Sequence, residues 1–277
     1  MAVVALVLWG NAHWCLFLRV LLWFLFGIWL LTIIQVVYVK FFPPMVTPLM
    51  LRRYFQQWRS KGVHVKHQRQ FVTLDAISPH LVNAADAGEN LSLFIYDRGF
   101  LFKGMQRAYQ FSQKDKLLRG GSAISQQTAK NCFLPHSRTM LRKVIEAYYV
   151  VLMELLWGKK RIMECYLNVV EWGDGIYGCE AASQHYFHHP AATLDEYESA
   201  LLVAALPSPL KTNPESHTPL YDHRVKSVYN CLLTHEPIVW NARWEELNPK
   251  KIEEGNRGLL FFAKWLVLQK MHSKRKR

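Results

Sequence analysis

The first forty residues carry almost no polar side chains, whereas the rest of the chain mixes apolar and charged positions. Within residues 20–39 there is no charged side chain, and Gly, Thr and Gln are the only departures from an apolar run. A helix needs about 20 such residues to cross the hydrocarbon core of a bilayer. Arg19 and Lys40 bracket the run, and its Trp and Tyr residues suit the membrane interface. The pattern predicts a transmembrane helix over residues 20–39.

Residues 1–19 are also apolar, which leaves two interpretations of the N-terminus. Either the start codon is assigned too far upstream, or a hydrophobic leader precedes the membrane helix. A cleaved signal peptide fits less well, because its apolar core is shorter and a small-residue cleavage site follows it. Lys40, Arg52 and Arg53 follow the helix, and by the positive-inside rule they would place the rest of the chain in the cytoplasm.

Proline positions and hydrophobic periodicity divide the chain beyond the anchor into three regions. Proline interrupts helices, so the pair Pro43-Pro44 indicates a juxtamembrane linker region, which we place over residues 40–76. Residues 77–230 have mainly helical periodicity and weak strand-like alternation, which predicts a mainly α catalytic domain. Residues 231–277 are expected to form a helical extension with a basic tail.

Two helices are predicted in more detail. Residues 140–157 are apolar almost all round, a pattern typical of a buried central helix. Thr193 and Glu196 have the spacing of a capping box ahead of an apolar run, and Pro207 is expected to end that helix.

Composition narrows the class of protein. The chain has 277 residues, 51% of them hydrophobic, and a formal net charge of +13, which excludes a disordered or collagen-like chain. The excess of basic residues indicates an anionic partner, and charge alone does not choose between nucleic acid, phospholipid and a phosphate-bearing substrate. Five cysteines without a Cys-x-x-Cys pair predict free thiols rather than a metal or disulfide framework.

Charged residues on the predicted central helix are candidates for chemistry. Arg142, Lys143 and Glu146 have i, i+3 and i, i+4 spacing, so their side chains share one helix face. An unpaired buried charge is costly, so on so apolar a helix they should face a cleft or a polar network. The alternative is an ion pair at the helix surface.

A glycine-rich turn precedes a second polar helix start. Gly120, Gly121 and Ser122 lead into that helix, with Ser122 the expected N-cap, and such a turn presents backbone N–H groups to an anion or sugar hydroxyl. A capped loop without a ligand is the alternative. Gln126 and Gln127 are adjacent, so both cannot face the core, and at least one should face solvent or ligand.

These segments resemble the ordered motifs of glycosyltransferase family 51, the peptidoglycan transglycosylases, in their monofunctional membrane-anchored form. Residues 120–127 match the motif GxSTIxQQ, with Ala123 in place of Thr, and residues 142–146 match RKxxE in full. Residues 159–168 match KxxIxxxYLN. The resemblance extends from the proline-rich linker to about residue 230, and it implies a lysozyme-like helical catalytic domain.

The family's first motif, EDxxFxxHxG, is where the sequence departs from the pattern. With one inserted residue before Phe94, Glu89 takes the place of the motif's catalytic Glu. Asn90 then replaces the motif's Asp, and Asp97 replaces its His. Glu89 is the predicted general base, and the alternative is that the altered motif has silenced the site.

The resemblance implies a reaction and roles for named residues. Two lipid II units would react, with Glu89 taking a proton from the acceptor hydroxyl and with inversion to a β-1,4 glycan. Lys130, Arg142 and Lys143 would bind the leaving undecaprenyl diphosphate, with Mg²⁺ or Mn²⁺ a further expectation there. Glu146 would orient these cations or help hold a metal. The expected substrate-binding residues are Ser122, Gln126, Gln127, Lys130, Arg142, Lys143, Lys159 and Asn168.

The resemblance also implies a location and partners. The protein would be a single-pass protein of the bacterial cytoplasmic membrane with its catalytic domain on the outer side, contrary to the charge rule. Its partners would be lipid II, the growing lipid-linked glycan and other cell-wall synthesis proteins, with no nucleic acid.

Two other functions compete with the polymerase. A lysozyme-like body could cleave glycan strands, but such an enzyme has no need of the Arg142, Lys143 and Glu146 cluster. A silent membrane scaffold that binds lipid II is the other, supported by the irregular first motif. The Ser208 to Lys211 match to penicillin-binding enzymes lacks their companion motifs, and the His185 to His189 tract lacks further metal ligands.

Overall fold

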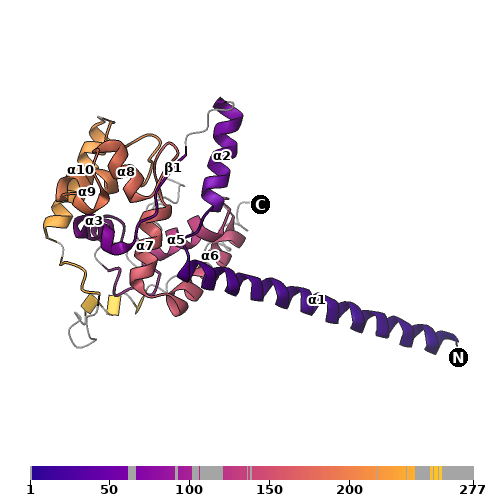
Figure 1. The fold of residues 1–277 in the computed structure, drawn as a ribbon. Coiled ribbons are helices and arrows are strands. Elements are labelled where there is room, and N and C mark those ends of the chain that lie inside the picture. Colours follow the sequence, from indigo (N-terminus) through magenta and orange to yellow (C-terminus); the bar gives the residue numbers. More distant parts are fainter. Residues whose placement is uncertain are drawn as a thin grey trace. The chain divides into compact units, whose positions relative to one another are not determined.

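A computed structural model describes the chain in two compact units, residues 1–42 and 43–277 (Figure 1). Residues 2–61, 67–90, 93–101, 121–135, 139–216, 218–234 and 236–240 are described, with residues 106, 137, 250–251, 253–254 and 256–257 in addition. Side chains are described from residue 16 onwards, except at Lys61.

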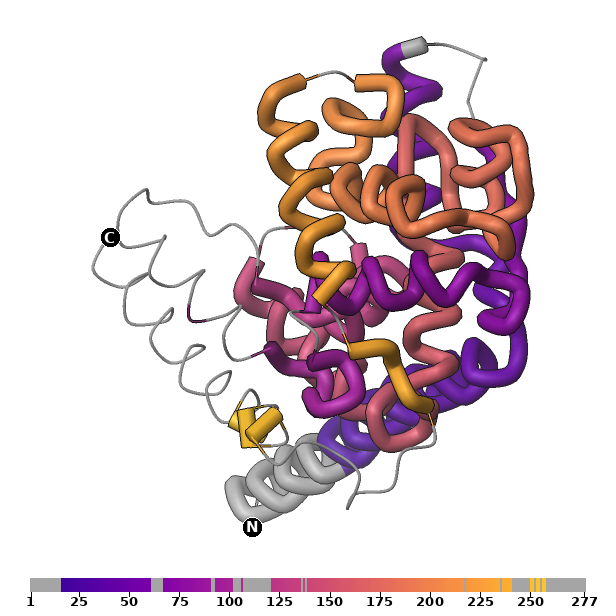
Figure 2. The backbone as a smooth tube through the Cα atoms, turned by 90° about the vertical axis from the view of Figure 1, so that its left-hand side faces the viewer, coloured from indigo at the N-terminus to yellow at the C-terminus, as the bar shows by residue number. Residues whose placement is uncertain are grey.

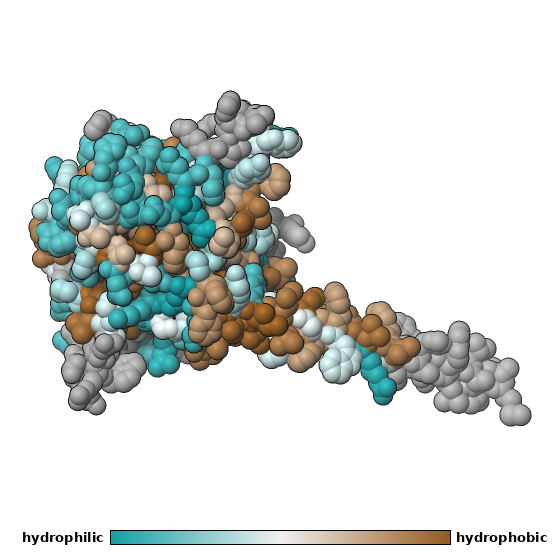
Figure 3. All heavy atoms as spheres, viewed as in Figure 1, coloured by the Kyte–Doolittle hydropathy of each residue, from teal (hydrophilic) through white to brown (hydrophobic). Residues whose placement is uncertain are grey.

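The first unit is a single long helix, α1 (Ala2–Phe41). Its segment Leu16–Phe41 is the one described helix that is long and apolar enough to cross a membrane. Large apolar side chains are exposed along it, as the brown surface of Figure 3 shows. The helix is longer than the span expected from the apolar run at 20–39, because the residues before Arg19 are helical too.

The second unit is built mainly of helices, which confirms the prediction of a mainly α body. Two of these helical segments are single 3-10 turns, η1 (Leu74–Ala76) and η2 (Ala191–Thr193). The α-helices are α2 (Pro48–Lys61), α3 (Pro79–Asn90), α5 (Ile124–Phe133), α6 (Met140–Leu156), α7 (Lys159–Val169), α8 (Cys179–Tyr186), α9 (Glu196–Ala205) and α10 (Pro219–Leu233).

One small sheet accompanies the helices. Its strands are β1 (Gln68–Arg69), β2 (Glu171–Gly173) and β3 (Ile176–Tyr177), in the order β1-β3-β2. The pair β2 and β3 is antiparallel, and β1 runs parallel to β3. Gly178 follows β3 with φ +86°, and a Cβ there would lie 3.0 Å from the backbone oxygen of Asn168. Glycine is therefore required where the chain turns from the sheet into α8.

Two groups of helices form the body. Helices α3, α9 and α10 pack on one another, and α5 packs between α6 and α7, with α3 also touching α5 (Figure 2). Helix α7 is the central one, because Ile162, Met163, Tyr166 and Leu167 have no exposed surface. The two groups meet where the C-terminal end of α3 approaches α5.

The sequence predicts a buried helix over residues 140–157. The helix is present as α6, but one of its faces is exposed and not buried. Leu141 and Leu155 of α6 are 70% and 76% exposed, and Val144, Ile145 and Val151 are exposed as well. The stripe follows one face of the helix at i, i+3 and i+4 spacing. An apolar face predicts burial against something non-aqueous, and the sequence does not say whether this is the protein core.

The capping prediction for α9 is displaced by one half turn of helix. The helix begins at Glu196, its N-cap is Asp195, and the box partner is Glu198 rather than Glu196. Thr193 belongs to η2 instead. Asp is as good an N-cap as Thr, so two overlapping boxes competed and the sequence alone did not separate them.

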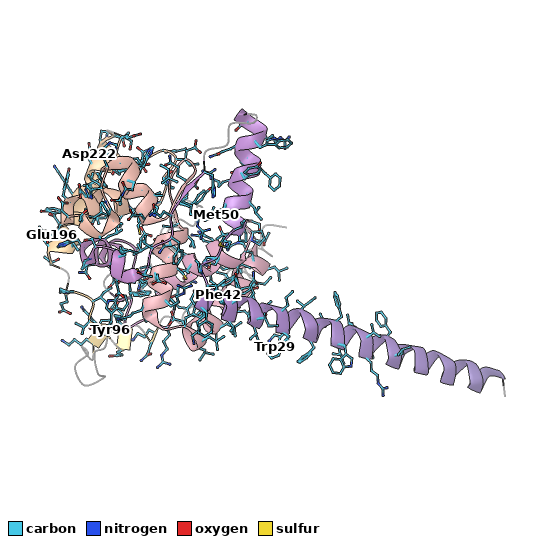
Figure 4. All side chains as sticks on the ribbon, in the orientation of Figure 1. Trp29, Phe42, Met50, Tyr96, Glu196 and Asp222 are labelled. Carbon is cyan, nitrogen blue, oxygen red and sulfur yellow. The ribbon has the colours of Figure 1, made fainter. Side chains whose placement is uncertain are left out.

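Helix α2 is amphipathic and rests on the sheet. Arg53 Nε lies 2.9 Å from both carboxylate oxygens of Glu171, and Gln57 Nε2 donates to Asp174 over 2.8 Å. Figure 4 labels Met50, which packs with Leu49 on Tyr177. The opposite face of α2 exposes Leu51, Tyr54, Phe55 and Trp58.

The cysteines with described side chains are all free. Cys132, Cys165 and Cys179 are buried, and Cys231 is exposed. Burial raises the pKa of the Cys165 and Cys179 thiols to about 12. These observations agree with the expectation of free thiols.

The ion pair between Arg53 of α2 and Glu171 of β2, which we call the clamp, predicts that Arg53→Met lowers the stability of the protein. Burial raises the pKa of Glu171, and Arg53 opposes this rise. Without Arg53 the carboxylate must ionise unpaired, so we expect the variant to lose about 2–3 kcal/mol at neutral pH. The pKa of Glu171 rises further in the variant, so the loss should shrink as the pH falls and the carboxyl is protonated.

Thermal unfolding of the detergent-purified chain at pH 5 and pH 8 measures this loss. Arg59→Met, on an exposed position of the same helix, serves as the matched control and should unfold like the parent. Equal melting temperatures for the two variants would contradict the clamp.

Candidate active site

Glu89 lies in the last turn of α3, and residues from two other helices hold its carboxylate. Arg224 of α10 lies 2.7 Å from Oε1, and Gln127 of α5 donates to Oε2 over 2.9 Å. The Glu89 side chain is only 13% exposed. An ionised carboxylate at this depth needs such partners, because burial without them costs several kcal/mol.

Burial raises the pKa of Glu89, and its neighbours oppose that rise. The Arg224 guanidinium, the Gln127 hydrogen bond and the Lys130 ammonium all favour the ionised form. The net direction is upward, so the carboxylate holds a proton more readily than an exposed Glu does. This combination suits a general base that must accept a proton near neutral pH.

Several buried polar atoms of α5, α7 and α10 have no hydrogen-bond partner among the described residues. They are the Tyr166 hydroxyl, Nε2 of Gln126 and Nε of Arg224. Burial raises the pKa of Tyr166, and the Glu89 charge raises it further. Native proteins seldom leave buried polar atoms unpaired, so these atoms mark a place for water or a bound hydroxyl.

A cationic cluster lies on α6 and includes a buried carboxylate. Arg142 and Lys143 each bind one oxygen of Glu146, which is 1% exposed. Lys143 Nζ also donates to Oγ of Ser122 over 3.2 Å. The sequence left two alternatives, an ion pair at the helix surface or a buried polar network. The structure combines them: the ion pair lies within one helix, and its carboxylate is buried.

Lys130 of α5 links this cluster to Glu89. Burial lowers the pKa of Lys130, Arg142 and Lys143 lower it further, and Glu146 and Glu89 oppose this. The Lys130 ammonium therefore interacts with both carboxylates. With Lys130 included, the cationic cluster has three cations and one carboxylate, Glu146, so it carries net positive charge that could attract an anion.

The two glutamines of the second motif face different ways. Gln126 is 1% exposed, and its Oε1 accepts from the backbone N–H of Ala123 over 3.0 Å. Gln127 faces Glu89. Ala123 is the N-cap of α5, so the expectation that Ser122 caps this helix is wrong. Gln126 can satisfy the N-cap backbone from inside the helix, which leaves Ser122 free to accept from Lys143.

Glycine conformation shapes the turn before α5. Gly121 has φ +89°, a value that L residues rarely adopt. Gly120, the first residue of the matched motif, lies outside the described residues.

Two residues expected to bind substrate make their contacts elsewhere. Lys159 forms ion pairs with Asp97 at 2.7 Å and Glu154 at 2.9 Å. Asn168 has no exposed surface, and its side chain hydrogen-bonds to the backbone of Val72 and Glu164. Their roles toward a substrate stay predictions.

The residues that depart from the first motif meet each other. Asn90 Nδ2 donates to Asp97 Oδ2 over 2.6 Å, and Asn90 Oδ1 accepts from the Ile124 N–H over 3.0 Å. Both side chains are buried. Positions 90 and 97 therefore form a closed hydrogen-bonded unit directly after Glu89.

Sequence reasoning missed Arg224, although the chain carries a signal for it. Tyr221, Val225 and Val228 are the buried face of α10, and Arg224 lies three positions after the first and four before the last. A charged residue on the inward face of an amphipathic helix needs a buried partner. The sequence does not say that the partner is 135 positions away.

The described residues do not fit a divalent metal ligand set. They include no group of three His, Cys, Asp or Glu side chains that could hold an ion. Both oxygens of Glu146 bind cations, and both oxygens of Glu89 bind Arg224 or Gln127. The expectation of Mg²⁺ or Mn²⁺ at the pyrophosphate stays a prediction, and no step below passes through a metal.

Comparison with known proteins places this arrangement in a family. The model of the transglycosylase family matches residues 56–232, which include every residue of the cluster from Glu89 to Arg224. A biosynthetic peptidoglycan transglycosylase of Caulobacter vibrioides is 47% identical over 179 residues, covering 65% of this chain and 75% of the relative.

Relatives with the same name come from other bacteria. That of Shewanella oneidensis is 45% identical over 193 residues, covering 69% of this chain and 81% of the relative. That of Rhodospirillum centenum is 42% identical over 202 residues, covering 73% and 84%. With a family match over more than half its length and relatives of this similarity, the chain belongs to the transglycosylase family.

Proposed function

We propose that the protein is a peptidoglycan glycosyltransferase that polymerises lipid II into β-1,4-linked strands and releases undecaprenyl diphosphate. One observation carries the proposal: the buried carboxylate of Glu89 lies near a cationic cluster, and Lys130 interacts with both. A base beside an anion-binding site is what glycosyl transfer from a diphosphate requires. The names of the relatives, each a biosynthetic peptidoglycan transglycosylase, support the same substrate class.

Glu89 acts on the acceptor. As the 4-hydroxyl oxygen of the acceptor sugar bonds to the anomeric carbon of the donor, its proton passes to the Glu89 carboxylate. Arg224 and Gln127 hold that carboxylate in place before the proton arrives. Attack from the side opposite the leaving group converts an α-linked donor into a β-linked product.

The cationic cluster acts on the leaving group. When the bond from the anomeric carbon to the diphosphate oxygen breaks, negative charge develops on that oxygen. Lys130, Arg142 and Lys143 are the groups placed to stabilise it. Glu146 keeps Arg142 and Lys143 together, so little reorganisation is needed as the charge forms.

Exposed apolar faces support a protein that works at a membrane. The first unit exposes apolar side chains along α1, and the second unit exposes the apolar faces of α6 and α2 described above. We propose a single-pass protein of the cytoplasmic membrane with its catalytic unit on the outer side, where the sugars of lipid II lie. Other cell-wall synthesis proteins stay predicted partners.

The two competing functions are less well supported. A silent scaffold was suggested by the irregular first motif, yet Glu89 is fully partnered and Asn90 and Asp97 bind each other. A glycan-cleaving enzyme has no use for a cationic cluster, because its leaving group is a sugar hydroxyl and not a diphosphate.

Polymerisation of labelled lipid II by the detergent-purified chain tests the proposal. Glu89→Gln keeps the size of the side chain and removes the base, so the rate should fall by about 100-fold or more. Glu196→Gln, at an exposed position of α9, is the matched control and should polymerise like the parent.

Two results would contradict the proposal in different ways. If Glu89→Gln polymerised lipid II at the parent rate, Glu89 would not be the general base. A parent that binds lipid II without turnover, where a known polymerase works, would favour the scaffold.

The Arg224 ion pair predicts a change in the pH dependence of the reaction. Arg224 lowers the pKa of Glu89, so Arg224→Met should raise that pKa further. The base is lost as it is protonated, so the acid limb of the profile of kcat/KM should move to higher pH. Arg224→Lys keeps the charge and should leave the limb near its parental position; an unmoved limb in Arg224→Met would rule out the coupling.

Thiol labelling tests the proposed side of the membrane. Cys231 is exposed, whereas Cys132, Cys165 and Cys179 are buried. In a Cys15→Ser background, an impermeant maleimide should label Cys231 in right-side-out spheroplasts and leave it unlabelled in sealed inverted vesicles. The reverse pattern would place the catalytic unit in the cytoplasm.

A further inference from the structure

Five buried or half-buried polar side chains form a ring beside Glu89. Its members are Asn90 of α3, Asp97 in the loop that follows, Lys159 of α7, Glu154 of α6 and Ser125 of α5. The backbone N–H of Ile124 closes the ring by donating to Asn90. The catalytic mechanism proposed above uses none of these side chains.

Asn90 both donates and accepts in this ring. Its Nδ2 donates to Asp97 over 2.6 Å, and its Oδ1 accepts from Ile124 at the first turn of α5 over 3.0 Å. Only a side chain with both functions can do this, and a carboxylate can only accept when ionised. Asn90 adjoins Glu89, so it ties the end of the helix that carries the base to the helix that carries Gln127.

Asp97 gathers the other half of the ring. Its Oδ1 accepts from the Gly99 N–H over 3.0 Å and from Lys159 Nζ over 2.7 Å. Lys159 continues to Glu154 over 2.9 Å, and Ser125 of α5 donates to Glu154 over 2.5 Å. Burial would lower the pKa of Lys159, but the two carboxylates outweigh it and the pKa is raised.

We propose that Asn90 and Asp97 are a coupled pair of positioning residues, in which the carboxylate that the family pattern has at position 90 has moved to position 97. The pair holds the C-terminal turn of α3 against α5 and so fixes Glu89 opposite Gln127. The proposal rests on the function proposed above and assigns a role to the residues that depart from the first motif.

The geometry makes the two positions interdependent. Asn90→Asp would put a second carboxylate within hydrogen-bond distance of Asp97, with no proton between them, and like charges there repel. Asp97→His, with Asn90 unchanged, would leave no carboxylate between Asn90 and Lys159 and no acceptor for the Asn90 amide in its present place. The double variant returns one carboxylate to the ring, at position 90, and one donor, at position 97, so it should succeed where each single variant fails.

The test is a cycle of Asn90→Asp, Asp97→His and the double variant, in the full detergent-purified chain. Each single variant should lose at least about tenfold in kcat with KM changed less than about twofold, because a displaced base slows the chemistry more than binding. The double variant should recover to within about threefold of the parent. Asn230→Asp, at an exposed position of α10, is the control and should match the parent.

A pH profile separates positioning from simple loss of packing. Lys159 of α7 contacts the pair directly, and Glu154 of α6 pairs with Lys159. The nearest carboxylates along α3 are Glu89, which precedes Asn90, and Asp86, one turn earlier. In Asn90→Asp, protonation of one carboxyl replaces the repulsion with a hydrogen bond. The activity of Asn90→Asp relative to the parent should therefore rise as the pH falls, and that of the double variant should not.

Thermal unfolding of the same four proteins keeps this test independent of the proposed function. The melting temperature should fall in each single variant and return in the double variant, even if no protein of the set polymerises lipid II. Effects on melting and kcat that simply add would show that positions 90 and 97 act independently and would overturn the pair. Single variants with parental kcat would remove its role in positioning Glu89.

Discussion

The pairing of Glu89 with Arg224 is the constraint on which the site depends, because an ionised carboxylate at that depth is stable only with a cation beside it. The two residues come together because α3 and α10 pack on each other and on α9. Gly88 makes this possible: a Cβ there would lie 2.6 Å from a methyl group of Val203 in α9. The position before Glu89 is therefore occupied by the one residue that lets α3 approach so closely.

Helix α6 shows how one element serves two surroundings. One face carries Arg142, Lys143 and the buried Glu146 of the cationic cluster, and another exposes Leu141 and Leu155. The charged groups of the cluster and apolar groups that suit a lipid surface are separated by no more than the width of a helix. Chemistry on a lipid-linked substrate requires both surfaces close together.

Local pattern predicted what local physics decides. The extent of α6 and the mainly helical body followed from periodicity. The resemblance to the family singled out Glu89, Glu146, Lys130 and Gln127, and the structure brings these four side chains near one another. The burial of α6 and the partner of Glu89 did not, since both depend on which surfaces meet in three dimensions. The start of α9 was ambiguous because two capping boxes overlap in sequence. Asn90 and Asp97 looked like damage to a motif, and only their hydrogen bond shows that the two substitutions belong together.

The free thiols have a consequence for how this chain reaches its fold. All four cysteines beyond α1 are unpaired, and burial raises the pKa of three of them, so these thiols stay protonated and react slowly with oxidants. No covalent cross-link has to form or be corrected while the second unit folds. Its native state is reached by packing and hydrogen bonding alone, in a reducing compartment as in an oxidising one, without an oxidase or a disulfide isomerase.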